Sequence, residues 1–197
     1  MVGTERYDEV RLRRRLETLD RASRASFAAA CAERLWPLVE RYALVSSVPA
    51  DRVAQLRGAL DAVWAGAMGQ AADVAGAQHL AESMVPREDE KWVMEAGYGQ
   101  NAIAAIAYAA RTWLTDHPQA AVWAARQVYE AGDYGAQQEL DDGVFSAAVE
   151  EELQNAPVVV AAVRAIADDL EAAGSETAET VRQRSQAGAS AFAGLFP

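Results

Sequence analysis

The chain has 197 residues, and its formal net charge of −11 arises from 29 acidic residues against 18 lysines and arginines. Because binding to nucleic acid requires a basic surface that neutralises phosphates, this charge balance argues against a nucleic-acid partner. Hydrophobic residues make up 51% of the chain, alanine is the commonest type and β-branched clusters are scarce, so the composition predicts an all-α protein with one buried core.

The first two predicted helices cover residues 8–19 and 22–44. In the second, apolar side chains recur at the three- and four-residue spacing of a helix face that packs on a core. These side chains are Phe27, Cys31, Leu35, Leu38 and Tyr42. Trp36 points away from this face, which indicates a helix contacted on two sides, and we expect this helix at the centre of the bundle. Pro37 lacks the N–H of a helix interior, so we expect a kink there.

A basic stretch coincides with the first helix. Its arginines are Arg6, Arg11, Arg13, Arg14 and Arg15, and acidic residues alternate with them. This pattern is typical of a solvated helix face with ion pairs between residues four apart. A patch that docks on a partner is the alternative.

Further helices are expected at residues 51–69, 71–85, 99–114, 118–131, about 144–155 and 157–174. Gly132 and Gly135 are expected to mark a turn, and Pro157 either begins a helix or bends one. The pattern predicts a single domain over residues 1–174 with six to eight mostly antiparallel helices. Residues 175–197 are expected to form a tail that is helical or partly disordered.

The common chemistries of all-α proteins require spacings that this sequence lacks. A di-metal carboxylate site requires Glu-x-x-His pairs, and neither His79 nor His117 has a glutamate three residues before it. Zinc requires a cluster of cysteine and histidine, whereas Cys31 is the one cysteine and is expected to be a buried, inert thiol. We therefore predict no metal, no cofactor and no catalytic residue.

Two groups of polar residues remain as candidate ligand-binding positions. They are Arg34, Arg41, Arg57 and Asp61 on the two most apolar helices, and Asn101 and Tyr108 on helix 99–114. Inside the bundle the first group would form either a hydrogen-bonded network that specifies helix pairing or a pocket for a carboxylate or phosphate. Because buried charges are generally paired, we favour the network. Asp168 and Asp169 are expected on the solvated face of their helix.

The sequence resembles a known family in several motifs. These are part of the segment Arg15 to Leu19, then Phe27, Ala30 to Arg34, Trp36–Pro37 and Leu60 to Trp64. In these motifs, over about residues 11 to 174, the chain is similar to the YjaG-like bacterial proteins, a family built around a domain of unknown function. The resemblance implies a small all-α fold and a bacterial cytoplasmic protein. It implies no catalytic residues.

The sequence also has no uncharged apolar stretch long enough to span a membrane, and its first residues, MVGTERYDEV, lack the apolar core of a signal peptide. We therefore expect a cytoplasmic protein that does not bind a membrane. The leading hypothesis is a non-catalytic interaction or regulatory module that binds another protein or forms a homodimer. The aromatic residues expected to be exposed for this purpose are Trp36, Trp92, Phe192 and Phe196.

Two other functions stay open. An immunity-like protein would use its acidic face to neutralise a basic partner. An enzyme or small-anion-binding protein would use Arg34 and neighbouring carboxylates in the core of the bundle. The apolar end of the tail is expected to dock either on the body of the protein or on a second copy.

Overall fold

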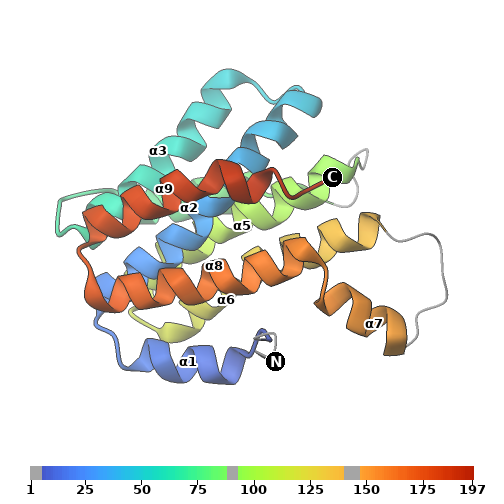
Figure 1. Ribbon diagram of the computed structural model, residues 1–197. Helices are drawn as coiled ribbons and strands as arrows, with labels where there is room; N and C mark the ends of the chain where they lie inside the picture. The colour runs from blue at the N-terminus through green and yellow to red at the C-terminus, as the bar shows by residue number, and fades with distance from the viewer. Residues whose placement is uncertain (1–5, 88–92, 140–146) are drawn as a thin grey trace.

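The computed structural model describes residues 6–87, 93–139 and 147–197, and every regular element in these ranges is an α-helix (Figure 1). The helices of the described ranges are α1 (Glu9–Glu17), α2 (Arg21–Val45), α3 (Ala50–Ala67), α4 (Val74–Met84), α5 (Met94–Thr115), α6 (Pro118–Gln138), α7 (Ala147–Gln154), α8 (Pro157–Ser175) and α9 (Ala178–Ala193). The all-α prediction is confirmed. Across these ranges, no helix combines the length and the apolar character that a membrane crossing requires.

The predicted number of six to eight helices is wrong, since the described ranges contain nine. Pro157 occupies the first position of α8, where a missing N–H costs nothing, so α7 and α8 are separate helices. In the tail, the side chain of Thr177 accepts a hydrogen bond from the backbone of Thr180 and caps α9. The tail therefore adds a helix of its own.

The central element is α2, which contacts α3, α5, α6, α8 and α9. Every residue from Ala25 to Glu33 is buried, so this half of the helix is enclosed around its whole circumference. A helix enclosed in this way belongs to the interior of a bundle, in agreement with the expected central position. Pro37 lies inside α2, which continues through it as one helix. A bend at Pro37 stays a prediction.

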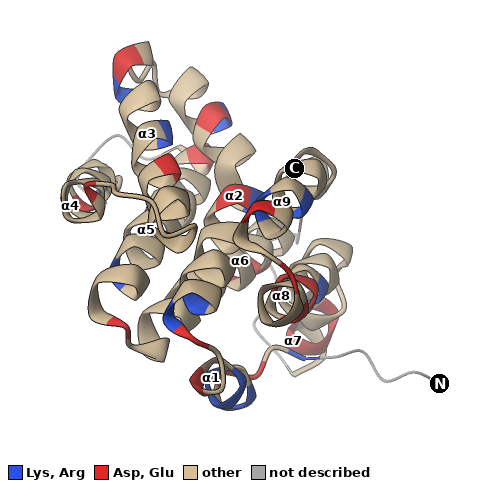
Figure 2. Cartoon of the chain, turned by 90° about the vertical axis from the view of Figure 1, so that its left-hand side faces the viewer, with Lys and Arg blue, Asp and Glu red and all other residues tan. Residues whose placement is uncertain are grey.

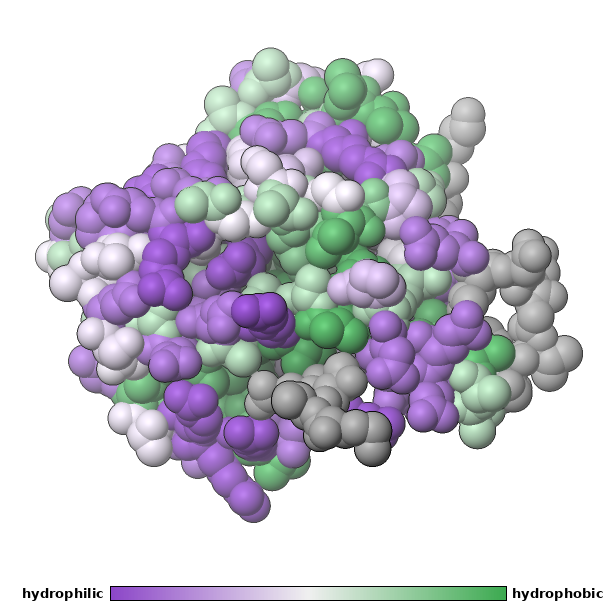
Figure 3. All heavy atoms as spheres, in the orientation of Figure 1, coloured by the Kyte–Doolittle hydropathy of each residue, from purple (hydrophilic) through white to green (hydrophobic). Residues whose placement is uncertain are grey.

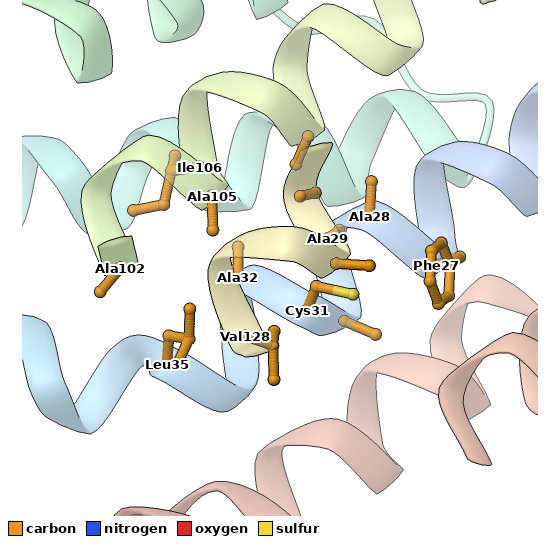
Figure 4. Close-up of a cluster of buried hydrophobic side chains, with 14 of the residues drawn as sticks. Phe27, Ala28, Ala29, Cys31, Ala32, Leu35, Ala102, Ala105, Ile106 and Val128 are labelled. Carbon is orange, nitrogen blue, oxygen red and sulfur yellow. The ribbon is translucent and has the colours of Figure 1, made fainter. Parts of the chain in front are cut away.

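Small side chains bring α5 and α6 close to α2. Figure 4 shows one buried cluster that includes Ala32 and Leu35 of α2, Ala102, Ala105 and Ile106 of α5, and Val128 of α6. Cys31 belongs to the same cluster and is fully buried, and burial raises the pKa of its thiol well above the ordinary value. The prediction of a buried cysteine is confirmed.

The contact between α5 and α2 is closest at Gly99. A Cβ atom at this position would overlap the first atoms of the Tyr42 side chain, which cannot move away without moving α2. We expect Gly99→Ala to lower the free energy of unfolding by about 1–3 kcal/mol. At Gly58 of α3 a Cβ atom would meet nothing within 4 Å, so Gly58→Ala is the matched control and should raise the free energy of unfolding by about 0.5–1 kcal/mol. Urea denaturation measures both values, and equal losses in the two variants would contradict this account.

The predicted turn at Gly132 and Gly135 is absent, because α6 continues through both glycines to Gln138. Their place is explained by packing. A Cβ atom on Gly132 would lie 3.1 Å from the Cβ atom of Ala162 in α8, and one on Gly135 would lie 3.1 Å from the ring of Phe196. These glycines therefore allow close contact between elements, where the sequence pattern had indicated a turn.

The chain end docks on the body of the protein. α9 packs on α2 and α8, and Phe192 and Phe196 are only 5% and 7% exposed. The ring of Phe196 meets Tyr98 of α5 edge-on, with ring centroids 5.3 Å apart. The expectation that Phe192 and Phe196 would be exposed is therefore wrong, since their apolar rings are covered by this chain itself.

Candidate functional site

The first candidate residue, Arg34, forms a two-pronged ion pair with Asp169 of α8. Its Nε donates to Oδ2 at 2.5 Å and its Nη2 donates to Oδ1 at 2.8 Å. The two side chains are 13% and 3% exposed. Burial alone would lower the pKa of Arg34, but the hydrogen bonds and charge of Asp169 raise it above its ordinary value, so the guanidinium keeps its charge. Burial raises the pKa of Asp169, and Arg34 opposes that rise.

A third helix covers this pair. A Cβ atom on Gly188 of α9 would collide with Nη1 of Arg34, so the backbone of α9 passes directly over the guanidinium. The arginine is thus enclosed by α2, α8 and α9, and its partner carboxylate occupies the edge that would bind an anion. This arrangement agrees with the structural interpretation of Arg34.

The neighbouring residue, Glu33, anchors a second network on the α3 side of α2. Its carboxylate accepts hydrogen bonds from Nη1 and Nη2 of Arg57 at 2.6 and 2.8 Å, and from the indole N–H of Trp64 at 3.0 Å. The side chain of Glu33 is 4% exposed and that of Arg57 is 25% exposed, so the bond from Trp64 is buried and the two from Arg57 are partly buried. Burial would lower the pKa of Arg57, but the hydrogen bonds and charges of Glu33 and Asp61 together raise it above its ordinary value.

Asp61 extends this second network to α9. Its Oδ1 accepts from Nη2 of Arg57 at 3.0 Å and from Nη2 of Arg182 at 2.6 Å. Arg57 and Asp61, one helical turn apart on α3, form an ion pair. Together, the network joins α2, α3 and α9.

The other candidates lie apart from these two networks. Arg41 pairs with Glu95 at 3.4 Å, contacts the backbone oxygen of Pro197 and covers the ring of Tyr98. Asn101 donates to the backbone of its own helix at Gly97. The half-buried ring of Tyr108 packs on Trp123, with centroids 5.5 Å apart. The predicted residues therefore do not converge on one pocket.

Trp36, a predicted interaction residue, is half-buried. Its indole N–H donates to Glu40 at 2.9 Å, and the guanidinium of Arg57 lies over its ring at 5.1 Å from the centroid. Trp92 lies outside the described residues. The described ranges contain no group of three histidine, cysteine or acidic side chains placed to share a metal ion.

Sequence reasoning missed Asp169, which was expected on a solvated face and is 2% exposed. A signal was present in the sequence. Ile166, Asp169, Leu170 and Ala173 fall at the spacing of one helix face, and all four are buried. A carboxylate in the middle of an apolar face requires a cationic partner, and the buried arginine of α2 is that partner.

The arginines of α1 form a separate exposed surface, which we call the arginine face. It consists of Arg11, Arg13, Arg14 and Arg15, all of them exposed. Figure 2 shows these blue positions along α1, at the edge of a molecule with many red positions. Val10, next to them in sequence, is 60% exposed.

The acidic residues that alternate with these arginines are mostly engaged elsewhere. Asp8 caps the backbone of α1, and Glu9 pairs with Arg126 of α6, where its second hydrogen bond measures 2.6 Å. The i,i+4 pairing expected for this helix occurs between Arg13 and Glu17, at 3.4 Å. Since Glu17 pairs with Arg13, the excess positive charge of the arginine face rests on Arg14 and Arg15.

Comparison with known proteins informs the fold. No family model and no curated protein sequence matches the chain. Among solved structures, the chain is similar to a DUF416 family protein from Shewanella baltica OS155, with a TM-score of 0.67 and 14% sequence identity. The similarity covers 93% of this chain and 90% of that chain. The chain therefore shares its overall fold with a member of a family of unknown function, and the YjaG-like resemblance stays a prediction.

Proposed function

We propose that the chain is a non-catalytic protein-interaction module of the bacterial cytoplasm, and that the arginine face of α1 is its docking surface for an acidic partner protein. The observation that carries this proposal is the engagement of Asp8 and Glu9 in other contacts, which leaves Arg14 and Arg15 of the arginine face without an ion pair to any described residue. Arginine is enriched among the residues that dominate protein interfaces, because its planar group forms paired hydrogen bonds with carboxylates.

The surroundings of α1 favour an acidic protein as its partner over a lipid surface or a nucleic acid. Leu12 and Leu16 of α1 are buried in the bundle, so Val10 is the one apolar residue of this helix that is free to enter a lipid surface, which is too little for stable membrane binding. The net charge of −11 repels the extended phosphate backbone of nucleic acid beyond the immediate contact. A compact acidic protein surface, in contrast, would meet the arginine face alone.

The core of the bundle supports a non-catalytic role. The buried guanidinium of Arg34 is held by Asp169, and Arg57 is held by Glu33 and Asp61. Groups paired with one another in this way stabilise helix packing. We therefore place the interaction at the surface.

The experiment begins with affinity purification of partners from the host, followed by reconstitution of each complex from purified components. We expect a partner with an acidic surface, whose dissociation constant rises with salt concentration and rises roughly tenfold or more in Arg14→Glu/Arg15→Glu. Arg164→Glu is the matched control, because Arg164 is an exposed arginine of α8 that lies outside the arginine face. Circular dichroism establishes that the variants are folded.

Three outcomes would overturn this proposal: no partner forms a reconstituted complex, the partner binds equally to the charge-reversed variant, or its contact surface is basic. Sedimentation of the purified chain tests the predicted homodimer in parallel. A dimer abolished by Arg14→Glu/Arg15→Glu would make a second copy the acidic partner.

A further inference from the structure

A hollow lies at the end of the bundle opposite α1, between the α2–α3 turn and the residues that follow α4. It comprises an inner cavity of about 320 Å³ and an outer cavity of about 560 Å³. The residues that line both are Tyr42, Val48, Arg52, Pro86 and Arg87. We call the two together the cleft. Each volume falls within the range of roughly 300–1,000 Å³ that is usual for small-molecule sites.

The inner cavity has an apolar floor. Val39 of α2, Leu56 of α3 and Ile103 of α5 line it, and each is 1% exposed. At the outer cavity, Val45 is 49% exposed, and Leu44 beside it in sequence is 83% exposed. Figure 3 shows green, apolar atoms gathered over this end of the molecule. Apolar residues therefore lie both at the depth of the cleft and at its rim.

The charged residues among the described lining of the cleft are arginines. Among the described residues that line it, Arg52 and Arg87 are charged and none is acidic, although acidic residues outnumber basic ones in the chain. Arg52 donates to the neutral side chain of Gln55 at 3.2 Å, and within the described ranges Arg87 has no side-chain hydrogen bond or ion pair. Both guanidinium groups therefore have donors available for an anion.

We propose that the cleft binds a small amphipathic anion, with its acidic head at Arg52 and Arg87 and its apolar body over Val39, Leu56 and Ile103. A medium-chain carboxylate has this chemistry. The apolar floor provides burial for the chain of the ligand, and the arginines select for negative charge, since a neutral ligand would leave them unpaired. This site is distinct from the arginine face, which lies on α1 at the other end of the bundle (Figure 1).

Isothermal titration calorimetry with sodium decanoate tests the proposal on the full chain. We expect saturable binding that weakens roughly tenfold or more in Arg52→Met/Arg87→Met, because methionine keeps apolar bulk and removes the charge. Arg164→Met is the matched control and should bind as the parent protein does. Decan-1-ol has the same chain without the charge, and inorganic phosphate has the charge without the chain, so each should bind at least tenfold more weakly than decanoate.

The proposal would be overturned by the absence of saturable decanoate binding, or by equal affinity of the parent protein and the double variant. Equal binding of decan-1-ol would show that the arginines do not select the ligand, and equal binding of phosphate would show that the apolar floor does not contribute. The α1 variant Arg14→Glu/Arg15→Glu should retain decanoate binding, so failure of the interaction proposal and failure of this one are separable.

Discussion

Replacing Arg34 by methionine is expected to lower the free energy of unfolding by about 3–5 kcal/mol, which is the usual cost of removing one partner from a buried ion pair. The change leaves the Asp169 carboxylate, whose side chain is 3% exposed, without its guanidinium partner inside the bundle. Urea denaturation followed by circular dichroism measures this loss. The denaturant dependence should stay unchanged, because the same surface becomes exposed on unfolding.

A double replacement separates the ion pair from its parts. In Arg34→Met/Asp169→Leu both charged groups give way to apolar ones, and we expect most of the lost stability to return. The exposed residue Arg164 supplies the control, since Arg164→Met should change the free energy of unfolding by less than about 0.5 kcal/mol. A fully stable Arg34→Met variant would mean that Arg34 is not a structural residue and would revive the anion-binding interpretation.

Replacing Trp64 by alanine is expected to lower the free energy of unfolding by about 3–5 kcal/mol, because this fully buried side chain is among the largest in the core and its removal creates a cavity. The change also removes the indole N–H that donates to the buried carboxylate of Glu33. Chemical denaturation measures the total effect.

Trp64→Phe separates the two contributions. Phenylalanine keeps much of the apolar volume but cannot donate to Glu33, so we expect an intermediate loss of about 1–3 kcal/mol, the range for a buried group deprived of one hydrogen bond. Val10→Ala, at an exposed position of α1, should have little effect. If Trp64→Phe were as stable as the parent protein, the contribution of the indole hydrogen bond would be negligible.

The periodicity of single helices was a good guide to the fold. The apolar spacing from Phe27 to Tyr42 marks α2, and Pro118 after His117 marks the start of α6, as predicted. The sequence did not reveal the role of two glycines. Gly132 and Gly135 allow close packing against residues that are distant in the chain. Local patterns do not reveal such partners, because the same residue type also favours turns.

In the candidate site, too, contacts between residues close in sequence could be predicted, and contacts between distant residues could not. Arg57 and Asp61 are one helical turn apart, so their pairing was predictable from spacing alone. The partner of Arg34 lies 135 residues away, and nothing near Arg34 in the sequence points to Asp169. The cleft was not foreseen at all, because it is formed by the ends of several elements whose relative positions depend on the whole bundle.

The enclosure of α2 has a consequence for the order in which the protein is assembled during synthesis. α2 is made early, yet α8 and α9, which close one side of it and contribute Asp169 and Arg182 to its networks, are made last. Until they emerge from the ribosome, the apolar surface of α2 on that side and the charge of Arg34 face water. A nascent chain halted before α8 would therefore carry an uncovered, alanine-rich surface, and such a chain is a natural client for chaperones.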